Sequence, residues 1–347
     1  MFGERRLSKQ FGYGRNSSDE PILSITEEER AALYRLVETL GPIDSRKLNG
    51  TFFTQLEMIG HQIPERIKEG LIHFRRYPNR FGALLLRGLP VDLKLPPTPQ
   101  DGNPSSEKTS FVSEYLLMIS MLFLGEPIGY SEEKRGQLIH DICPVQGQED
   151  RQENSGSRSL FEFHTEDAFH PHRPDHLALF CLRSDHDQQA RTDVASIVNA
   201  MQMMPSAAIT LLRQPLYRLR APSSFGTLEY ATTVPVLTGS LLQPELCMNS
   251  HTMEGINSEA QWALDTLIEA FEEVSVGYVL LPGDLIIIDN RLAVHGRSSF
   301  SPRYDGEDRW LQRLFTVTDI RRSSFSRAPN QNVCVPLNIE FAMQGSQ

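Results

Sequence analysis

The chain beyond residue 130 is built from short apolar runs separated by turn residues, and this pattern constrains the fold more than any other feature. Runs of about four to eight apolar, β-branched and aromatic residues bounded by Gly, Pro, Asn or Asp predict strands. Their number and spacing favour a β-sandwich or a barrel. The runs are QLIHDI, SLFEFH, LALFCL, PVLTGS, GYVLLPGDLIIIDN and RLFTVTDI.

A helix is expected to interrupt these strands at residues 258–274, SEAQWALDTLIEAFEEV. A capping box from Ser258 to Gln261 predicts where it starts. Apolar residues then recur with helical spacing, which predicts one buried face. The residues expected on that face are Trp262, Leu267, Ile268 and Phe271.

The first 125 residues have longer helical patterns around a single predicted strand. A capping box from Thr26 to Glu29 precedes apolar residues on one face and predicts a helix that ends before Gly41. Further helices are expected at about 51–75 and 111–124, and a strand at 83–88. We therefore expect an α+β fold with a mainly β core, in one domain of residues 1–347. Residues 1–125 would form a helical layer, and residues 126–347 the β core.

Composition and charge exclude several classes of partner. The net charge is −10 and no basic block occurs, so neither nucleic acid nor a membrane surface is an expected partner. The longest apolar run, residues 115–124, is too short to cross a bilayer, which takes roughly 18–20 apolar residues. No apolar segment follows the basic residues of the N-terminus, and the four cysteines form no C-x-x-C pair. The predicted location is the cytoplasm, with reduced thiols.

The most specific local pattern is His164-Thr165-Glu166, at the end of the strand-like run SLFEF. Alternation along a strand points residues i and i+2 to the same side, so both side chains could reach one metal ion. In a chain with 10 His and 44 acidic residues, about one such spacing is expected by chance. A solvated polar loop is the alternative explanation.

His295 is a candidate third ligand. It lies among small and apolar residues in LAVHGR, shortly after the strand-like run DLIIID. Two His and one carboxylate from different strands form the facial triad that binds non-haem Fe(II) and leaves positions open for substrate and O₂. A core histidine without a metal would have the same neighbours, so His295 alone does not distinguish the two.

Arg313 lies in the next strand-like run, WLQRLF. Alternation turns Arg313 to the same face as Leu311 and Phe315. Trp310 and Leu314 face the other way. A planar guanidinium suits bidentate capture of a carboxylate, and an Arg that shares a face with Leu and Phe needs an anionic partner. The alternative is a surface arginine.

Together these segments resemble the clavaminate synthase-like branch of the Fe(II)/2-oxoglutarate dioxygenases, which includes hydroxylases of free amino acids. That branch has H-T-E where most of the superfamily has H-x-D. The resemblance covers nearly the whole chain and implies a double-stranded β-helix, or jelly roll, as the core. It rests on HTEDAFHPHRPDHLALFCLRSD at 164–185, NRLAVHGRSSFSPRYDGEDRWLQR at 290–313 and LPPTP at 95–99.

The resemblance assigns cofactor roles to particular residues. It implies that His164, Glu166 and His295 are the iron ligands. Arg313 would pair with the distal carboxylate of 2-oxoglutarate, and Thr192, in ARTDVAS, would help to hold that co-substrate.

The resemblance also implies a substrate site. Arg309 would meet the carboxylate of an amino-acid substrate, and Glu133 and Asn154 would hold its α-amino end, although an exposed acid and a loop amide explain these two residues equally well. Relatives that accept basic amino acids have D-x-D in the segment that reads CMNSHTMEG here, so Asn249 and His251 replace both carboxylates. A cationic side chain would lose its counter-charges. The expected substrate side chain is therefore neutral or acidic.

The implied reaction is hydroxylation of an unactivated C–H bond of a free L-amino acid or a small molecule derived from one. It would use Fe(II), 2-oxoglutarate and O₂ and release succinate and CO₂. Retention of Glu166 argues against halogenation, which in related enzymes requires a vacant carboxylate position. Desaturation or another oxidation by the same site is one alternative, and a non-catalytic metal-binding jelly-roll protein is another. The sequence specifies neither the substrate, nor the carbon attacked, nor the oligomeric state.

Overall fold

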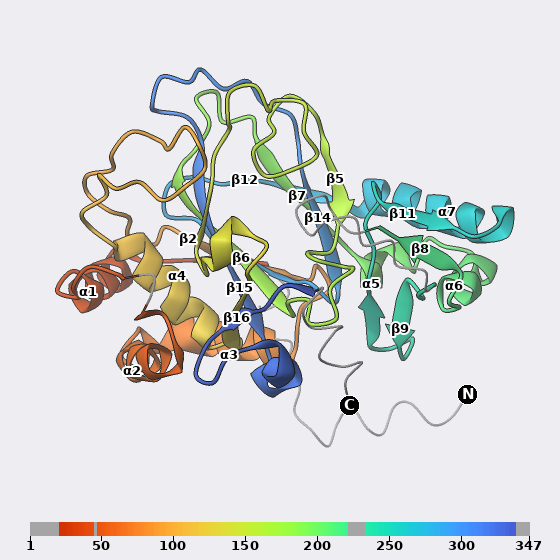
Figure 1. Ribbon diagram of the computed structural model, residues 1–347, viewed down its shortest axis with the longest axis horizontal. Coiled ribbons are helices and arrows are strands. Elements are labelled where there is room, and N and C mark those ends of the chain that lie inside the picture. The colour runs from red at the N-terminus through yellow and green to blue at the C-terminus, as the bar shows by residue number, and fades with distance from the viewer. Residues whose placement is uncertain (1–20, 45–46, 221–232, 338–347) are drawn as a thin grey trace.

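The structure is a computed structural model that describes residues 21–44, 47–220 and 233–337. Two β-sheets face each other at its centre (Figure 1). In spatial order the larger sheet contains β1 (Ile22–Ser24), β2 (Ala83–Arg87), β13 (Leu285–Asp289), β6 (His176–Arg183), β15 (Trp310–Val317), β3 (Glu126–Tyr130) and β16 (Val333–Cys334). A further strand, β4 (His140–Ile142), pairs with β15. The smaller sheet contains β12 (Val276–Val279), β7 (Arg191–Ser196), β14 (Ala293–Arg297) and β5 (Phe161–His164). The core is the expected jelly roll.

Side chains of the strands alternate between two apolar cores. In β13, Leu285 and Ile287 pack toward the N-terminal helices, whereas Ile286 and Ile288 pack between the two sheets. This follows from the period of two along a strand. Residue Phe315 of β15 likewise faces the space between the sheets. The alternation predicted for WLQRLF is confirmed, and it directs Arg313 into that space.

Four helices cover the outer face of the larger sheet, at the lower left of Figure 1. They are α1 (Glu27–Val37), α2 (Gly50–Gly60), α3 (Glu65–Arg76) and α4 (Val112–Leu122). The predicted capping box of Thr26 and Glu29 is present. The single helix expected at 51–75 is wrong: the chain turns between α2 and α3 because Pro64 has no N–H and disfavours helical backbone at the residue before it. This region also supplies β1, which the sequence did not predict.

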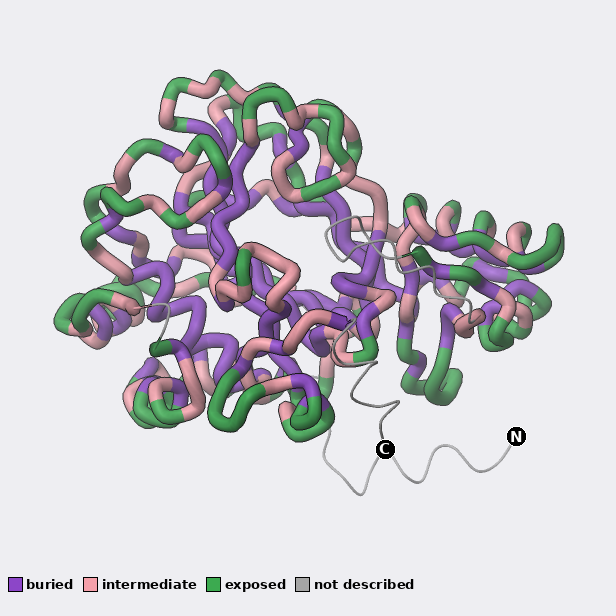
Figure 2. The backbone as a smooth tube through the Cα atoms, viewed as in Figure 1, coloured by how far each residue is buried: buried purple, intermediate pink, exposed green. Residues whose placement is uncertain are grey.

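A second layer covers the outer face of the smaller sheet. It contains α5 (Ile197–Ala200), α6 (Ser206–Leu212), α7 (Ser258–Val274) and the strand pairs β8 (Tyr217–Leu219) with β11 (Met253–Gly255) and β9 (Leu237–Gly239) with β10 (Pro244–Leu246). Only α7 was predicted as a helix, and its range is confirmed. Figure 2 shows the buried backbone along the central strands and exposed residues on the outer sides of both helical layers.

Two details predicted for α7 need correction. Its N-cap is Asn257, whose side chain accepts from the N–H of Ala260, and not Ser258. Trp262 is 46% exposed, although Leu267 and Phe271 are buried as expected. Five positions separate Trp262 from Leu267, which turns the two side chains about 140° apart around the helix.

The two ends of the described chain contribute to one sheet, because β1 and β16 are the opposite edge strands of the larger sheet. This supports the proposal that residues 1–347 form one domain. Short 3-10 helices occupy Lys134–Gly136 and Ile320–Ser326. In the described ranges, no helix is long and apolar enough to span a membrane.

Candidate functional site

Two histidines and a glutamate from separate segments converge between the sheets. His164 ends β5 and lies directly opposite His295 of β14, so both side chains project from the same face of the smaller sheet. Their ring centroids are 4.3 Å apart, and Glu166 Oε2 lies 3.5 Å from His295 Nε2. One donor atom from each residue lies within 4.8 Å of the others, and all three residues are buried. The structure therefore brings together the predicted triad.

The donor atoms of this triad fit a divalent metal ion. Glu166 Oε2 is buried and has no hydrogen-bond partner in the described part of the chain. His164 Nδ1 lies 2.8 Å from the backbone oxygen of Glu162, which must accept, so the ring proton is on Nδ1 and Nε2 has a free lone pair. Fixing the tautomer through the second ring nitrogen is the usual arrangement of a metal-binding histidine.

The electrostatic surroundings of Glu166 and His164 favour the protonation states that can bind a metal ion. Burial opposes ionisation of Glu166, but the Arg313 guanidinium and the two imidazoles hold the pKa of this carboxyl well below its usual range. Burial, followed by the neighbouring His295, lowers the pKa of His164 to about 4. Near pH 7 the site thus offers a carboxylate and a neutral His164 imidazole.

Asn290 holds the backbone of Glu166 in place and was missed as a site residue. Its Oδ1 accepts from the Glu166 N–H at 2.7 Å, and its Nδ2 donates to the Glu166 carbonyl at 3.0 Å. The side chain is completely buried. The available signal was its position in the segment that leads to His295.

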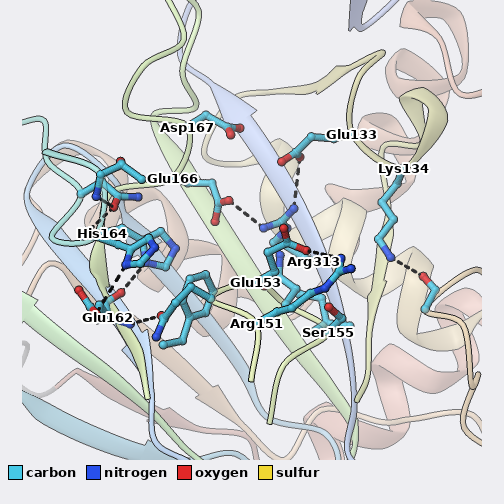
Figure 3. A pocket seen from close by; sticks show the side chains of 18 of the residues that line it. Glu133, Lys134, Arg151, Glu153, Ser155, Glu162, His164, Glu166, Asp167 and Arg313 are labelled. Carbon is cyan, nitrogen blue, oxygen red and sulfur yellow. Dashed lines mark hydrogen bonds and ion pairs between the residues drawn. The ribbon is translucent and has the colours of Figure 1, made fainter. Parts of the chain in front are cut away.

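A cavity of about 950 Å³ opens beside the triad (Figure 3). Its lining includes His164 and Glu166 together with Arg313 and four predicted substrate residues, which are Glu133, Asn154, Asn249 and His251. Neither Thr192 nor Arg309 is among the described residues that line it. The structure thus brings most of the predicted site residues to one cavity.

Arg313 has the anionic partners that its buried position requires. Its Nη1 donates to Glu166 Oε1 at 2.8 Å, and its Nη2 donates to Glu133 Oε2 at 3.3 Å. Figure 3 shows both carboxylates directed at the guanidinium, with Asp167 beside them. Burial, then the charges of Glu133 and Glu166, raises the pKa of Asp167 well above its usual range. Burial raises the pKa of Glu133 to about 7, although Arg313 opposes this.

Thr192 lies beside Arg309, a contact that was not predicted from the sequence. Arg309 Nη2 lies 3.4 Å from Thr192 Oγ1. Arg313 lies in β15, and Arg309 immediately precedes this strand, four positions before Arg313. At about 3.3 Å per residue, the backbones of the two arginines are about 13 Å apart. Their even spacing predicts the same side for both, so alternation alone could not assign them to different partners.

Arg309 and Arg297 form a second buried cationic site, and neither residue is part of the described cavity lining. Arg297 is opposite Thr192 in the β14–β7 pair, and both guanidiniums lie near the ring of Phe300. Neither arginine forms an ion pair with a carboxylate of the described residues. Burial, then the charge of Arg309, lowers the pKa of Arg297 to about 9. A site of this kind favours an anionic ligand.

Asn249 and His251 lie in a turn that is joined to the triad. Asn249 forms a β-bridge with His164, and its Oδ1 accepts from the N–H groups of His251 and Thr252. The His251 side chain is 56% exposed, and its Nδ1 is 3.7 Å from Glu162 Oε1. Glu162 lines the same cavity and was not predicted as a site residue. It lies two positions before His164 on the same face of β5.

Comparison with protein families then identifies the chain. A model described as taurine catabolism dioxygenase TauD, TfdA family, matches residues 54–315. The chain belongs to this family.

Individual members of the TauD family resemble it over most of their length. The L-asparagine oxygenase of Streptomyces coelicolor is 41% identical over 271 residues, which cover 77% of this chain and 80% of the relative. The L-lysine 3-hydroxylase of Catenulispora acidiphila is 33% identical over 316 residues, 88% and 87% of the two chains. A solved asparagine oxygenase in complex with Fe(II), (2S,3S)-3-hydroxyasparagine and succinate has a TM-score of 0.85 and 34% identity, covering 91% of this chain and 99% of that chain. This TauD-family protein is an Fe(II)- and 2-oxoglutarate-dependent dioxygenase, and it acts as a hydroxylase.

Proposed function

We propose that this protein hydroxylates a free L-amino acid whose side chain is neutral or acidic, at a carbon close to Cα. The observation that carries the proposal is the cavity beside the triad, in which the buried Arg313 and the half-buried Glu133 face each other at 3.3 Å. A zwitterionic amino acid has the opposite arrangement of charges. Its α-carboxylate can pair with Arg313 and its α-amino group with Glu133, with Asn154 on the same lining.

His164, Glu166 and His295 are the proposed metal ligands. Bound Fe(II) supplies the activation of O₂, coupled to oxidative decarboxylation of 2-oxoglutarate to succinate and CO₂. The residues of the chain contribute geometry: Asn290 fixes the backbone of Glu166, and the Glu162 carbonyl fixes the ring of His164. Their burial also limits the access of water to the reacting carbon.

The proposed roles of the two arginines are the reverse of those expected from the sequence. Arg309 and Thr192 hold 2-oxoglutarate, because they are in contact and the described carboxylates leave Arg309 without an ion pair. Arg313 holds the substrate carboxylate, because it lines the cavity together with Glu133 and Asn154. 2-Oxoglutarate and the amino-acid substrate would then each bind to a different arginine.

Separate Arg→Lys substitutions distinguish these roles. Lys retains the charge but loses the planar fork, so a KM is expected to rise about tenfold, equivalent to about 1.4 kcal/mol. Arg309→Lys should raise the KM for 2-oxoglutarate, and Arg313→Lys the KM for the amino acid. Steady-state succinate release with each ligand varied in turn gives both constants. The reverse pattern would restore the assignment made from the sequence.

Asn290→Ala is expected to weaken metal binding by about 10- to 100-fold, the usual effect of removing a group that orients a ligand. Titration with Mn(II) measures this without any turnover. Asn332→Ala is the matched control, because Asn332 is also buried and donates to a backbone oxygen, that of Pro127, at 2.7 Å. Equal Mn(II) affinities for the two variants would reject the role of Asn290.

The residues that line the cavity indicate which carbon reacts and which type of substrate side chain is accepted. Arg313 contacts Glu166, so a substrate carboxylate bound there places the carbons next to Cα nearest to the metal. The Streptomyces relative acts on L-asparagine, and the solved asparagine oxygenase holds a product hydroxylated at C3. We therefore infer C3 as the site of attack. Asn249 and His251, on the same lining, provide no fixed negative charge for a cationic side chain.

An amino-acid panel tests the proposal. Asparagine, aspartate, glutamine, glutamate, lysine and arginine are each incubated with the protein, Fe(II), 2-oxoglutarate and ascorbate. A mass gain of one oxygen in a neutral or acidic member, located at C3 by fragmentation, is the expected result. A loss of two hydrogens would instead identify desaturation. Oxygenation of lysine or arginine alone would overturn the proposed selectivity.

The proposed site of action is the cytoplasm. The four cysteines are present as thiols in the structure, and three of them are buried. This is the usual state of cysteine in a reducing compartment.

A further inference from the structure

His140 contacts the guanidinium of Arg313 from the neighbouring strand. β4 and β15 pair so that His140 lies opposite Arg313. His140 Nδ1 is 2.9 Å from Arg313 Nη2, and His140 Nε2 is 2.7 Å from the backbone oxygen of Gln137. The His140 side chain is 1% exposed. The contact is therefore shielded from solvent and fixed at both ends of the ring.

The two partners of the ring determine its protonation state. A guanidinium can only donate and a carbonyl oxygen can only accept, so Nδ1 must be the acceptor and Nε2 must hold the proton. Both contacts select the same neutral tautomer. Burial, then the charge of Arg313, lowers the pKa of His140 to about 3, so the ring stays neutral over the working range of an enzyme.

The other polar partners of Arg313 have separate roles. Glu166 is a proposed metal ligand, and Glu133 is proposed to receive the α-amino group of the substrate. His140 is thus the partner of Arg313 that no ligand engages, since both its ring nitrogens are satisfied within the chain. Phe315 completes the enclosure, with its ring centroid 4.3 Å from Arg313 Cζ and 5.7 Å from the centroid of His140.

We propose that His140 is a positioning residue, which holds Arg313 Nη2 so that the guanidinium stays oriented toward the substrate carboxylate while Glu133 binds the α-amino group. This inference rests on the proposed role of Arg313 as the substrate arginine. It assigns His140 no contact with the substrate or the metal. His140 acts only through the hydrogen bond to Arg313.

Two substitutions separate the hydrogen bond from simple packing. His140→Leu removes the acceptor, whereas His140→Asn places Oδ1 close to the position of Nδ1 and can accept the same bond. We expect His140→Leu to raise the KM for the amino acid about tenfold with a smaller change in kcat, and His140→Asn to stay within about threefold of wild type. The amino acid is the best substrate of the panel above. The KM for 2-oxoglutarate is measured on the same preparations, and melting temperatures establish that both variants are folded.

The outcomes distinguish this inference from the function on which it rests. A raised KM for the amino acid in His140→Leu, restored in His140→Asn, supports both. A raised KM for 2-oxoglutarate instead, again restored by Asn, retains His140 as the positioning residue but overturns Arg313 as the substrate arginine. Wild-type values of both constants in a folded His140→Leu variant, or equal impairment in Leu and Asn, would overturn the inference.

Discussion

His164→Ala and His295→Ala are each expected to abolish 2-oxoglutarate turnover while the fold is retained. Each substitution removes one of three proposed protein ligands, and the loss should exceed the roughly 10- to 100-fold that removal of an outer group causes. The two side chains face each other across β5 and β14, at a position where smaller residues leave the strand pairing intact. Succinate release measures turnover, and Mn(II) titration measures the loss of metal affinity directly.

His186→Ala is the matched control for these variants. His186 also lies beside carboxylates, with Nε2 3.0 Å from Asp305 and Nδ1 3.9 Å from Asp308, but Asp305 is exposed and the group is separate from the cavity. It should retain turnover and Mn(II) affinity. Normal turnover in His164→Ala or His295→Ala would reject the triad, and loss of turnover in all three variants would point to a general effect of removing histidine.

The second large effect is a change of selectivity in the double variant Asn249→Asp with His251→Asp. The ratio of kcat/KM for lysine to kcat/KM for asparagine should rise at least tenfold, or about 1.4 kcal/mol. Glu162 already lies 3.7 Å from His251 Nδ1, so the variant replaces the imidazole beside Glu162 with a second carboxylate. Three carboxylates near one part of the cavity would attract a cationic side chain and repel an acidic one.

The double variant should change the charge of the cavity lining without disrupting the turn that contains Asn249 and His251. Asn249 Oδ1 accepts two backbone N–H bonds in its turn, and an aspartate oxygen can accept the same bonds, so the turn should be preserved. Gln202→Asp with Gln243→Asp adds charge at two exposed positions outside the cavity lining and serves as the control. Unchanged relative rates for asparagine, aspartate and lysine would assign Asn249 and His251 to the turn alone.

Local pattern was sufficient to predict many of the central strands, among them β2, β5, β6, β13 and β15, and the main chemistry-bearing residues. The period of two in WLQRLF placed Arg313 on the buried face, and the spacing in His164-Thr165-Glu166 placed two donors on one side of a chain segment. Both properties depend on neighbours within a few positions, which the sequence displays directly. The same reasoning failed at Pro64, where the restricted proline backbone divides one predicted helix into two. It also failed at Trp262, whose angular position on α7 turns its side chain away from the buried face.

Tertiary structure alone decided which partner each buried polar group meets. Arg309, directly before β15, and Arg313, within it, are four positions apart, so alternation does not distinguish them. Only the packing of the two sheets brings Thr192 of β7 to Arg309, and only the pairing of β4 with β15 brings His140 to Arg313. The contact of Arg309 with Thr192 joins residues that are 117 positions apart in the sequence, and the contact of Arg313 with His140 joins residues that are 173 positions apart. The hydrogen bond from the Glu166 N–H to Asn290 spans 124 positions. Such contacts depend on strand pairing and on the stacking of the two sheets, which bring together segments that have no local relation in the sequence. The sequence by itself determined the donor groups of a metal-dependent oxygenase, and the packing of its two sheets determined which ligand each arginine is placed to hold.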